Sequence, residues 1–425
     1  MVTLEMVLQP ENLRKALQQV VANKGVPGVD GMTVEELLPW IKSHPHELTE
    51  QIRRGRYRQH PVLRKYIPKD NGEQRPLGIP RVIDRFVQQA TAQVLSDAYE
   101  PKFSDNSYGF RPNRCAQDAI NKVLENANEG YEYVVDLDLA KFFDTVNHSK
   151  LLQVLSETIK DGRVISLIHK FLRAKIQDGK EVRTPTMGTP QGGPISPILA
   201  NILLNELDQE LERRNHRFVR YADDMMIMCK SNRAAKRTYE AIVRYITEKL
   251  FLKINEDKTK VCGLGEDVKF LGFSFYKGKD PKDGDKTRWE ATVHRKSWAK
   301  LKDKVRAIMD RRCPNGVKRT QEYLKTTLRG WANYFRTGIH KSRMREVDGW
   351  IGRRIRQMYW KQWKRIRTRY DMLKKYGVGH NNAYQWANTS KGYWKIAGSW
   401  ILATTLTNKV LEEEGWVRIR SFVKL

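Results

Sequence analysis

The segment from Phe218 to Met228, FVRYADDMMIM, constrains the fold of this 425-residue chain more than any other segment. It places the adjacent carboxylates of Asp223 and Asp224 between two runs of strand-forming residues, and Asp favours turn positions. The pattern predicts a β-hairpin with acidic residues at its tip. An exposed acidic turn would normally show polar alternation on one flank, which MMIM does not. From this segment alone, an acidic surface turn and a divalent-metal site both stay open.

A second acidic segment, YVVDLDLAKFFDTVNH, lies upstream at residues 133 to 148. Asp136 and Asp138 are two residues apart and share one face of a predicted strand, whereas Val135 and Leu137 point to the other face. Acids on a strand opposite an acidic hairpin are typical of two-metal phosphoryl transfer, with the metals about 4 Å apart. The spacing leaves open whether Asp136 is instead a structural hydrogen-bonding partner.

Charge is distributed unevenly along the chain. Lysine and arginine total 78 against 49 aspartate and glutamate, a formal net charge of +29. Residues 291 to 425 contain 32 basic and 9 acidic residues, a net +23, so residues 1 to 290 carry only +6. This excess favours a polyanionic partner such as nucleic acid.

The densest basic stretch is GRRIRQMYWKQWKRIRTRY, from Gly352 to Tyr370. Its apolar residues recur at helical spacing, which predicts one amphipathic helix with a cationic face. A solvated charged surface is the plainer alternative. A membrane surface has little support, because mean hydropathy is −0.65 and no long apolar run occurs. The candidate nucleic-acid-binding residues are Arg353, Arg354, Arg356, Lys361, Lys364, Arg365, Arg367 and Arg369.

Cysteine usage and the N-terminus point to the compartment. The four cysteines form no C-x-x-C pair, so the sequence predicts reduced thiols rather than a zinc site or a disulfide framework. The first 17 residues predict an amphipathic helix and lack the features of a secretion signal. We therefore expect a cytoplasmic protein with no membrane partner.

Between these segments the chain alternates helices and strands. Residues 1 to 58 are predicted to be helical, and VLRKYIPKDNGEQRPLGIP predicts a β-hairpin turning at Asp70-Asn71-Gly72. Lys69 and Arg75 flank that turn, where they either reach a triphosphate or are surface charges. Helices are expected at 84–98 and 115–128, over a stretch from 149 to 174, and up to about residue 214. The result is a mixed α/β core.

Several motifs together resemble a known family. YADD, the D-x-x-x-x-F of Asp138 to Phe143, GTPQGG, LKINEDKTKV and FLGFSF occur in the order of reverse-transcriptase palm motifs. With NKGVPGVDG, IPK and GFRPNR, the chain resembles the proteins encoded by group II introns, from about residue 5 to 400. The resemblance implies an α/β (α+β) right-hand polymerase, with fingers, a palm carrying the acidic β-hairpin, and an α-helical thumb called domain X. It implies four regions: 1–58, an N-terminal helical extension; 59–289, fingers and palm; 290–375, the thumb; and 376–425, a basic DNA-binding region.

Site roles follow from the same resemblance. Asp138, Asp223 and Asp224 match the family's metal-binding catalytic acids, and Asp138 is preferred over Asp136 because Phe143 lies five residues after it. Phe143 matches the aromatic beneath the nucleotide sugar. The remaining nucleotide-binding candidates are Lys69, Arg75, Gln191 and Lys258.

The resemblance also implies cofactors and partners. It implies two Mg²⁺ ions, dNTP substrates, an RNA template with a DNA or RNA primer, group II intron RNA and target DNA. The sequence ends without the signature of an HNH nuclease, so no DNA-cleavage domain is expected. Alternatives are a related reverse transcriptase serving host defence or DNA repair, a maturase that only binds RNA, and a basic nucleic-acid-binding protein on a degenerate polymerase scaffold.

Overall fold

The structure is a computed structural model that describes residues 2–68, 72–189, 192–279, 286–314 and 316–423. The chain divides into two compact units, Met1–Leu264 and Gly265–Leu425. No helix of the described residues is both long enough and apolar enough to cross a bilayer.

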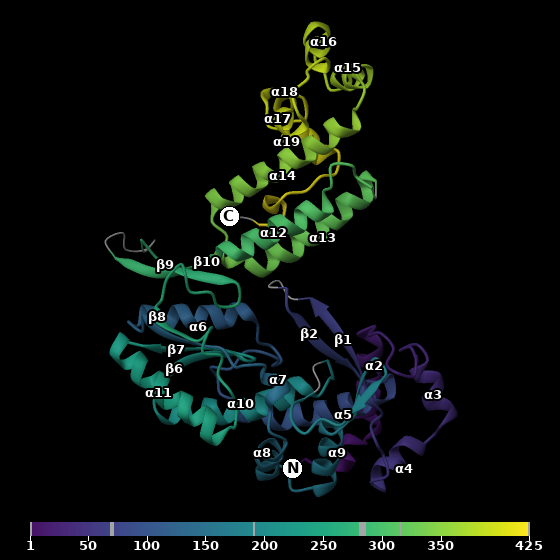
Figure 1. Cartoon of the computed structure of the whole chain (residues 1–425), viewed down its shortest axis with the longest axis vertical. Coiled ribbons are helices and arrows are strands. Elements are labelled where there is room, and N and C mark those ends of the chain that lie inside the picture. Colours follow the sequence, from purple (N-terminus) through teal and green to yellow (C-terminus); the bar gives the residue numbers. More distant parts are fainter. Residues whose placement is uncertain (1, 69–71, 190–191, 280–285, 315, 424–425) are drawn as a thin grey trace. The chain divides into compact units, whose positions relative to one another are not determined.

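The first unit combines two small sheets with surrounding helices (Figure 1). Its strands are β1 Val62–Pro68, β2 Gln74–Ile79, β3 Tyr133–Leu137, β4 Ile176–Asp178, β5 Glu181–Arg183, β6 Arg217–Tyr221, β7 Asp224–Cys229 and β8 Lys260–Gly263. Its helices are α1 Leu4–Val7, α2 Pro10–Ala22, α3 Leu37–Ser43, α4 Glu47–Arg53, α5 Val82–Tyr99, η1 Glu100–Lys102, α6 Ala116–Asn128, α7 Phe142–Thr145, α8 His148–Thr158, α9 Gly162–Leu172, α10 Ser196–Arg213 and α11 Asn232–Lys249.

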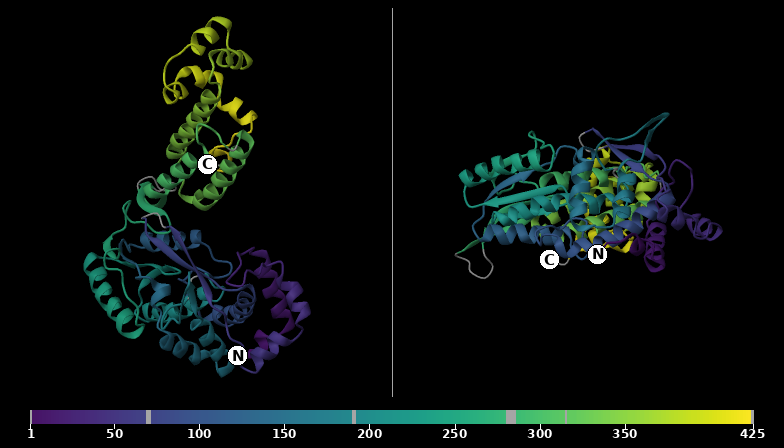
Figure 2. Two further views of the ribbon diagram at one scale, coloured as in Figure 1. Left: turned by 45° about the vertical axis from the view of Figure 1, so that its right-hand side comes forward. Right: turned by 90° about the horizontal axis from the view of Figure 1, so that it is seen from below.

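One sheet has the order β6-β7-β3-β8, and all of its pairings are antiparallel. Figures 1 and 2 show it between α6 on one face and α10 and α11 on the other. The period-two pattern of β3 is confirmed: Val135 and Leu137 are buried in the main core, paired with Ile227 and Met225. The opposite face carries Asp136.

The other sheet has the order β2-β1-β4-β5. The predicted hairpin at residues 62–79 is confirmed, with β1 antiparallel to β2 and Ile67 opposite Arg75. β1 also pairs in parallel with the start of β4, Val62 opposite Ile176. The expected turn residues Asp70 and Asn71 lie outside the described residues.

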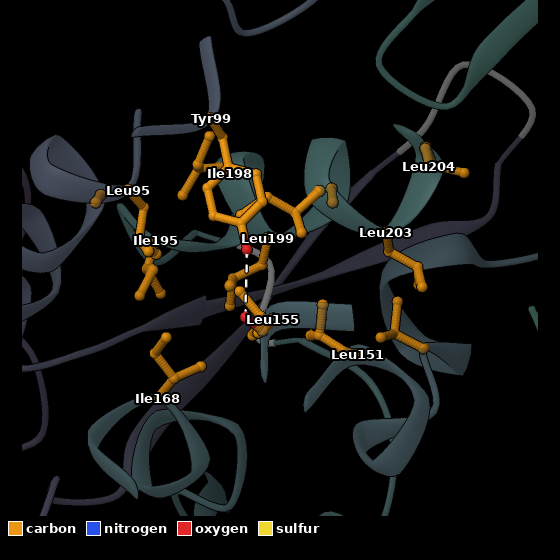
Figure 3. Packing of buried hydrophobic residues seen from close by; sticks show 14 of the residues in the cluster. Leu95, Tyr99, Leu151, Leu155, Ile168, Ile195, Ile198, Leu199, Leu203 and Leu204 are labelled. Atoms are coloured by element: carbon orange, nitrogen blue, oxygen red, sulfur yellow. Dashed lines mark hydrogen bonds between the residues drawn. The ribbon is translucent and has the colours of Figure 1, made fainter. Parts of the chain in front are cut away.

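The main hydrophobic core joins α5, α8, α9 and α10. Figure 3 shows Leu95, Leu155, Ile168 and Leu199 converging from these helices, with the Tyr99 hydroxyl donating to the Leu155 carbonyl oxygen at 3.5 Å. Truncating a fully buried leucine such as Leu155 to alanine typically costs about 2–5 kcal/mol. The four helices therefore share one hydrophobic core.

Two predicted helices of the first unit are each interrupted. The N-terminal helix is divided between α1 and α2, because Pro10 has no N–H to donate and begins the second helix. The stretch from 149 to 174 is divided between α8 and α9. There the Asp161 carboxylate caps α9 by accepting from the Arg163 N–H at 3.0 Å, and it accepts from the Leu4 N–H at 2.9 Å.

The second unit is a β-hairpin followed by helices. Its elements are β9 Phe273–Lys279, β10 Thr287–Val293, α12 Arg295–Ile308, α13 Val317–Phe335, η2 Arg336–Gly338, α14 Lys341–Gln362, α15 Ile366–Lys375, α16 His380–Ala387, α17 Tyr393–Ala397, α18 Trp400–Thr405, α19 Asn408–Glu413 and η3 Ile419–Ser421. The helix α14 is buried along one side, and Trp360 is fully enclosed.

The prediction of one amphipathic helix through residues 352–370 is wrong. The helix α14 ends at Gln362, and α15 starts at Ile366. The break has a packing cause: the buried ring of Trp363 lies 6.0 Å from the rings of Tyr359, Trp360 and Tyr376. Tyr376 follows α15, so the chain must turn to bring it back to this cluster. Ile366, one of the apolar residues whose helical spacing led to that prediction, is 54% exposed.

Candidate active site

The acidic hairpin predicted from the sequence is formed by β6 and β7. Tyr221 pairs with Asp224, which leaves Ala222 and Asp223 as the two residues of the turn. Ala222 has φ +58°, a left-handed conformation that is uncommon for a residue with a side chain. Met225 to Cys229 are all buried, so the hairpin is part of the core and is not an exposed surface loop.

The acidic side chains come together through strand register. Asp136 on β3 pairs with Met226 on β7. Because side chains alternate between the two faces of a strand, Asp138, two residues after Asp136, lies on the same face as Asp136. Asp224, two residues before Met226, lies on this face too. Asp224 is exposed, whereas Asp138 and Asp223 are partly buried.

Asp138 and Asp223 line one cavity of about 1110 Å³. Arg75 from β2, Phe143 from α7 and Lys258 line the same cavity. The Lys258 ammonium nitrogen lies 3.8 Å from a carboxylate oxygen of Asp138, with both side chains partly exposed. The structure therefore brings five of the predicted site residues together. Two others, Lys69 and Gln191, lie outside the described residues.

The electrostatics of the acids reflect burial and mutual repulsion. Burial, with the charges of Asp224 and Asp138, raises the pKa of Asp136 from 3.8 to about 6. Burial also raises the pKa of Asp223, an effect opposed by the charge of Arg75. A cluster of carboxylates that repel one another is stabilised by a cation.

The oxygen donor atoms of these carboxylates fit a hard divalent cation. Among the described residues, no group of three or more His, Cys, Asp or Glu side chains is gathered closely enough to hold a metal ion. Mg²⁺ in phosphoryl-transfer sites commonly takes one or two carboxylates together with substrate phosphates and water. Asp138 and Asp223, lining one cavity, supply those carboxylates.

Phe143 is held rigidly at the edge of this cavity. Its side chain is 7% exposed, and its ring lies 5.2 Å from the ring of Phe142. Its carbonyl oxygen accepts from the Thr189 N–H at 2.6 Å, which ties α7 to the start of the TPQGG segment. The ring of Phe143 is thus buried, and its backbone is hydrogen-bonded to the segment that begins at Thr189.

The raised pKa of Asp136 leads to a prediction about stability. Below about pH 3 the carboxyl is protonated in both the folded and the unfolded states. As the pH rises toward 6, the unfolded chain releases the proton before the folded chain does, so folding stability falls across this window. Asp136→Asn is expected to remove the fall and to raise the free energy of unfolding at pH 7 by roughly 2–3 kcal/mol. Urea unfolding of the wild type and of Asp136→Asn from pH 4 to 7 measures the free energy of unfolding. Parallel pH profiles for the two proteins would contradict the prediction.

The eight predicted nucleic-acid-binding residues comprise a group of four internal arginines, a group of three exposed residues, and Lys361, which belongs to neither group. Four arginines donate to backbone carbonyl oxygens inside the second unit: Arg353 to Trp394, Arg354 to Met309, Arg356 to Leu406 and Arg369 to Trp363. Lys364, Arg365 and Arg367 are exposed around the break between α14 and α15, and the Lys361 ammonium lies 4.7 Å from the Tyr393 ring centroid.

Sequence reasoning missed Arg220, which is fully buried directly before the YADD turn. Its Nη1 donates to the Ala222 carbonyl oxygen at 3.0 Å. A signal was present: an arginine inside the apolar run FVRY needs a buried partner. Arg64 and Asp144, which also line the cavity, carried no comparable signal.

Comparison with known proteins defines the class. Residues 67–275, which contain the hairpin and most of the residues lining the cavity, match the family "Reverse transcriptase (RNA-dependent DNA polymerase)". With the acidic hairpin set in a four-stranded antiparallel sheet, this match identifies an RNA-directed DNA polymerase. Polymerases of this family generally use divalent metal ions and dNTPs.

A second match narrows the family. Residues 298–377 match the "Group II intron, maturase-specific domain". The chain is 34% identical to Protein YkfC of Escherichia coli (strain K12), over 63% of this chain and 81% of YkfC. It is 28% identical to the group II intron-encoded protein LtrA of Lactococcus lactis subsp. cremoris, over 63% of this chain and 55% of LtrA. Identity to the putative COX1/OXI3 intron 2 protein of Saccharomyces cerevisiae is 30%, over 60% of this chain and 35% of that protein.

The chain belongs to the family of group II intron-encoded reverse transcriptases with a maturase domain. The two domains together support reverse transcription and a maturase function in intron splicing and mobility.

Proposed function

We propose that this protein extends a DNA or RNA primer on an RNA template, using dNTPs and two Mg²⁺ ions held by Asp138, Asp223 and Asp224. The observation that carries the proposal is the cavity in which Asp138, Asp223, Arg75, Phe143 and Lys258 meet. When bound, the ions supply an activated primer 3′-hydroxyl and neutralise charge on the departing pyrophosphate.

The protein's own residues bind and orient the substrates. Arg75 lies at the cavity wall and binds the triphosphate, as does Lys69 by its place in the sequence. Lys258, beside Asp138, offsets charge near the incoming phosphates. Gln191 is assigned to the nucleotide pocket by its place in the TPQGG motif. Catalysis by such a site consists mainly of positioning and charge stabilisation.

Phe143 is proposed to exclude ribonucleotides by lying beneath the sugar. Phe143→Ala should raise incorporation of ribonucleotides relative to dNTPs by roughly 10- to 100-fold, because an aromatic face that clashes with a 2′-hydroxyl would be removed. Single-nucleotide incorporation with dGTP and GTP on one template measures the ratio. Phe171→Leu is the control, since Phe171 of α9 is a buried phenylalanine that lines neither the larger cavity nor the smaller one shared by Phe143 and Thr189. Unchanged selectivity would remove Phe143 from this role.

The second unit is proposed to bind group II intron RNA and target DNA. The support is its net charge of +23 over residues 291–425 and the maturase-domain match. We propose that residues 1–58 form the N-terminal extension, 59–289 the fingers and palm, 290–375 the thumb, and 376–425 a DNA-binding region. We also propose that the protein acts in the cytoplasm.

Primer extension by the full chain tests the proposed polymerase. A labelled DNA primer on an RNA template, with dNTPs and Mg²⁺, is expected to give cDNA that disappears when Mg²⁺ is removed with EDTA. Tight RNA binding without any primer extension would contradict the proposed polymerase and would support a maturase that only binds RNA.

A further inference from the structure

Arg220 lies at the centre of a buried polar network behind the acidic turn. Its Nε donates to both carboxylate oxygens of Asp208, at 2.8 and 3.0 Å. Its Nη1 donates to the side-chain oxygen of Asn201 at 2.9 Å and to the carbonyl oxygen of Ala222 at 3.0 Å. All three side chains, Arg220, Asp208 and Asn201, are fully buried.

Burial of this ion pair has a large desolvation cost, which only complete pairing offsets. The pairing here is specific to the geometry of arginine, since one planar group contacts a carboxylate, an amide and a peptide carbonyl together. Replacing a buried ion pair by apolar residues of similar volume often leaves stability unchanged or raises it. The network therefore calls for a reason beyond stability.

The contact with Ala222 supplies that reason. The Ala222 carbonyl belongs to the peptide group that joins Ala222 to Asp223. The hydrogen bond from Arg220 therefore fixes the orientation of the peptide plane that immediately precedes Asp223. Ala222 is in a left-handed conformation, φ +58°. Such a conformation costs about 1–3 kcal/mol and persists only where surrounding contacts hold it.

A second element holds the turn from another side. The backbone of Gly109 lies so close that a Cβ there would be 2.3 Å from the Ala222 nitrogen and 2.9 Å from the Tyr221 carbonyl carbon. The Asn201 amide nitrogen donates to the Gly109 carbonyl oxygen at 2.8 Å, which links this contact to the Arg220 network. The Tyr108 N–H donates to the Arg220 carbonyl oxygen at 2.9 Å.

We infer that Arg220, Asp208, Asn201 and Gly109 are positioning residues that hold the Ala222–Asp223 turn in the conformation that binds the catalytic metals. The inference rests on the proposed role of Asp223 as a metal ligand. None of the four residues lines the cavity of Asp138 and Asp223. They act through the backbone of the turn and make no contact with substrate.

Arg220→Lys tests the network. Lysine keeps the positive charge beside Asp208, but it lacks the planar fork that reaches Asn201 and Ala222 at once. In a complex of full-length protein, RNA template, chain-terminated primer and dNTP, we expect the Mn²⁺ dissociation constant, measured by electron paramagnetic resonance, to rise at least about 10-fold. The Mg²⁺ concentration for half-maximal extension should rise in parallel, with template–primer affinity unchanged.

Gly109→Ala tests the same turn without touching a buried charge, in case the Arg220 variant fails to fold. Its Cβ would displace the turn backbone, so the Mn²⁺ dissociation constant should again rise. Gly162→Ala is the matched control, because a Cβ there meets nothing within 4 Å. Asp84→Asn is the control for lost stability: Asp84 is a fully buried carboxylate that accepts from the Tyr57 hydroxyl at 2.7 Å.

The outcomes separate this inference from the proposed function. Unchanged Mn²⁺ affinity in folded Arg220→Lys and Gly109→Ala proteins would overturn the inference while the wild type still makes cDNA. An equal loss of Mn²⁺ affinity in Asp84→Asn would overturn it too, since the effect would then be general destabilisation. A wild type that makes no cDNA and binds no Mn²⁺ in this complex would overturn the proposed function itself.

Discussion

Replacing Asp223 with asparagine is expected to reduce cDNA synthesis by at least about 10³-fold, because the substitution removes the charge of a proposed metal ligand at the reacting centre. The side chain changes little in volume, and its burial already raises the pKa of the carboxyl, so the fold should persist. Template–primer affinity should stay within about threefold of wild type. Single-turnover extension and a filter-binding titration of labelled RNA measure the two quantities.

The matched control is Asp257→Asn, which removes an acidic charge from the lining of the same cavity. It is expected to retain at least about half of wild-type activity, since no metal-binding role is proposed for Asp257. Near-equal losses in the two variants would mean that the cavity depends on overall charge and would contradict a ligand role for Asp223. Loss of RNA binding together with activity in Asp223→Asn would indicate a folding role.

Exchanging Lys364, Arg365 and Arg367 together for glutamine is expected to weaken RNA binding by roughly 10- to 100-fold in low salt. All three residues are exposed around the break between α14 and α15. Loss of three phosphate contacts should also lower the slope of log affinity against log salt concentration by about 2. Binding titrations between 50 and 300 mM salt, concentrations chosen for the assay, give both values.

The double variant Arg353→Gln/Arg356→Gln is the comparison. These arginines donate to the carbonyl oxygens of Trp394 and Leu406, and Arg353 stacks at 4.0 Å from the Trp394 ring centroid. The variant should lower the thermal stability of the protein and leave most of the salt slope intact. The assignment would be wrong if the double variant lost the salt dependence of RNA binding and the triple variant kept it. The internal arginines, and not the exposed residues, would then be the ones that contact phosphates.

Local patterns predicted correctly the strands and the turn that carry the candidate acids. The hairpin at Tyr221 to Asp224 and the alternation of Val135 and Leu137 depend on residues adjacent in the sequence, and turn preference and period-two burial act over that range. The helix boundaries were less accurate where one side chain decides them, as Pro10 and Asp161 do.

The sequence by itself determined which acids share a strand face, where the chain turns between them and which half carries the positive charge. The tertiary structure alone decided that Arg75 reaches the cavity of Asp138, that Trp363 ends α14, and that four predicted RNA-binding arginines donate to internal carbonyls. It also decided that Arg220 is paired with Asp208 behind the acidic turn. The physical reason is distance along the chain: Arg353 and Trp394 are 41 residues apart, and a periodic pattern does not specify which remote carbonyl an arginine will meet.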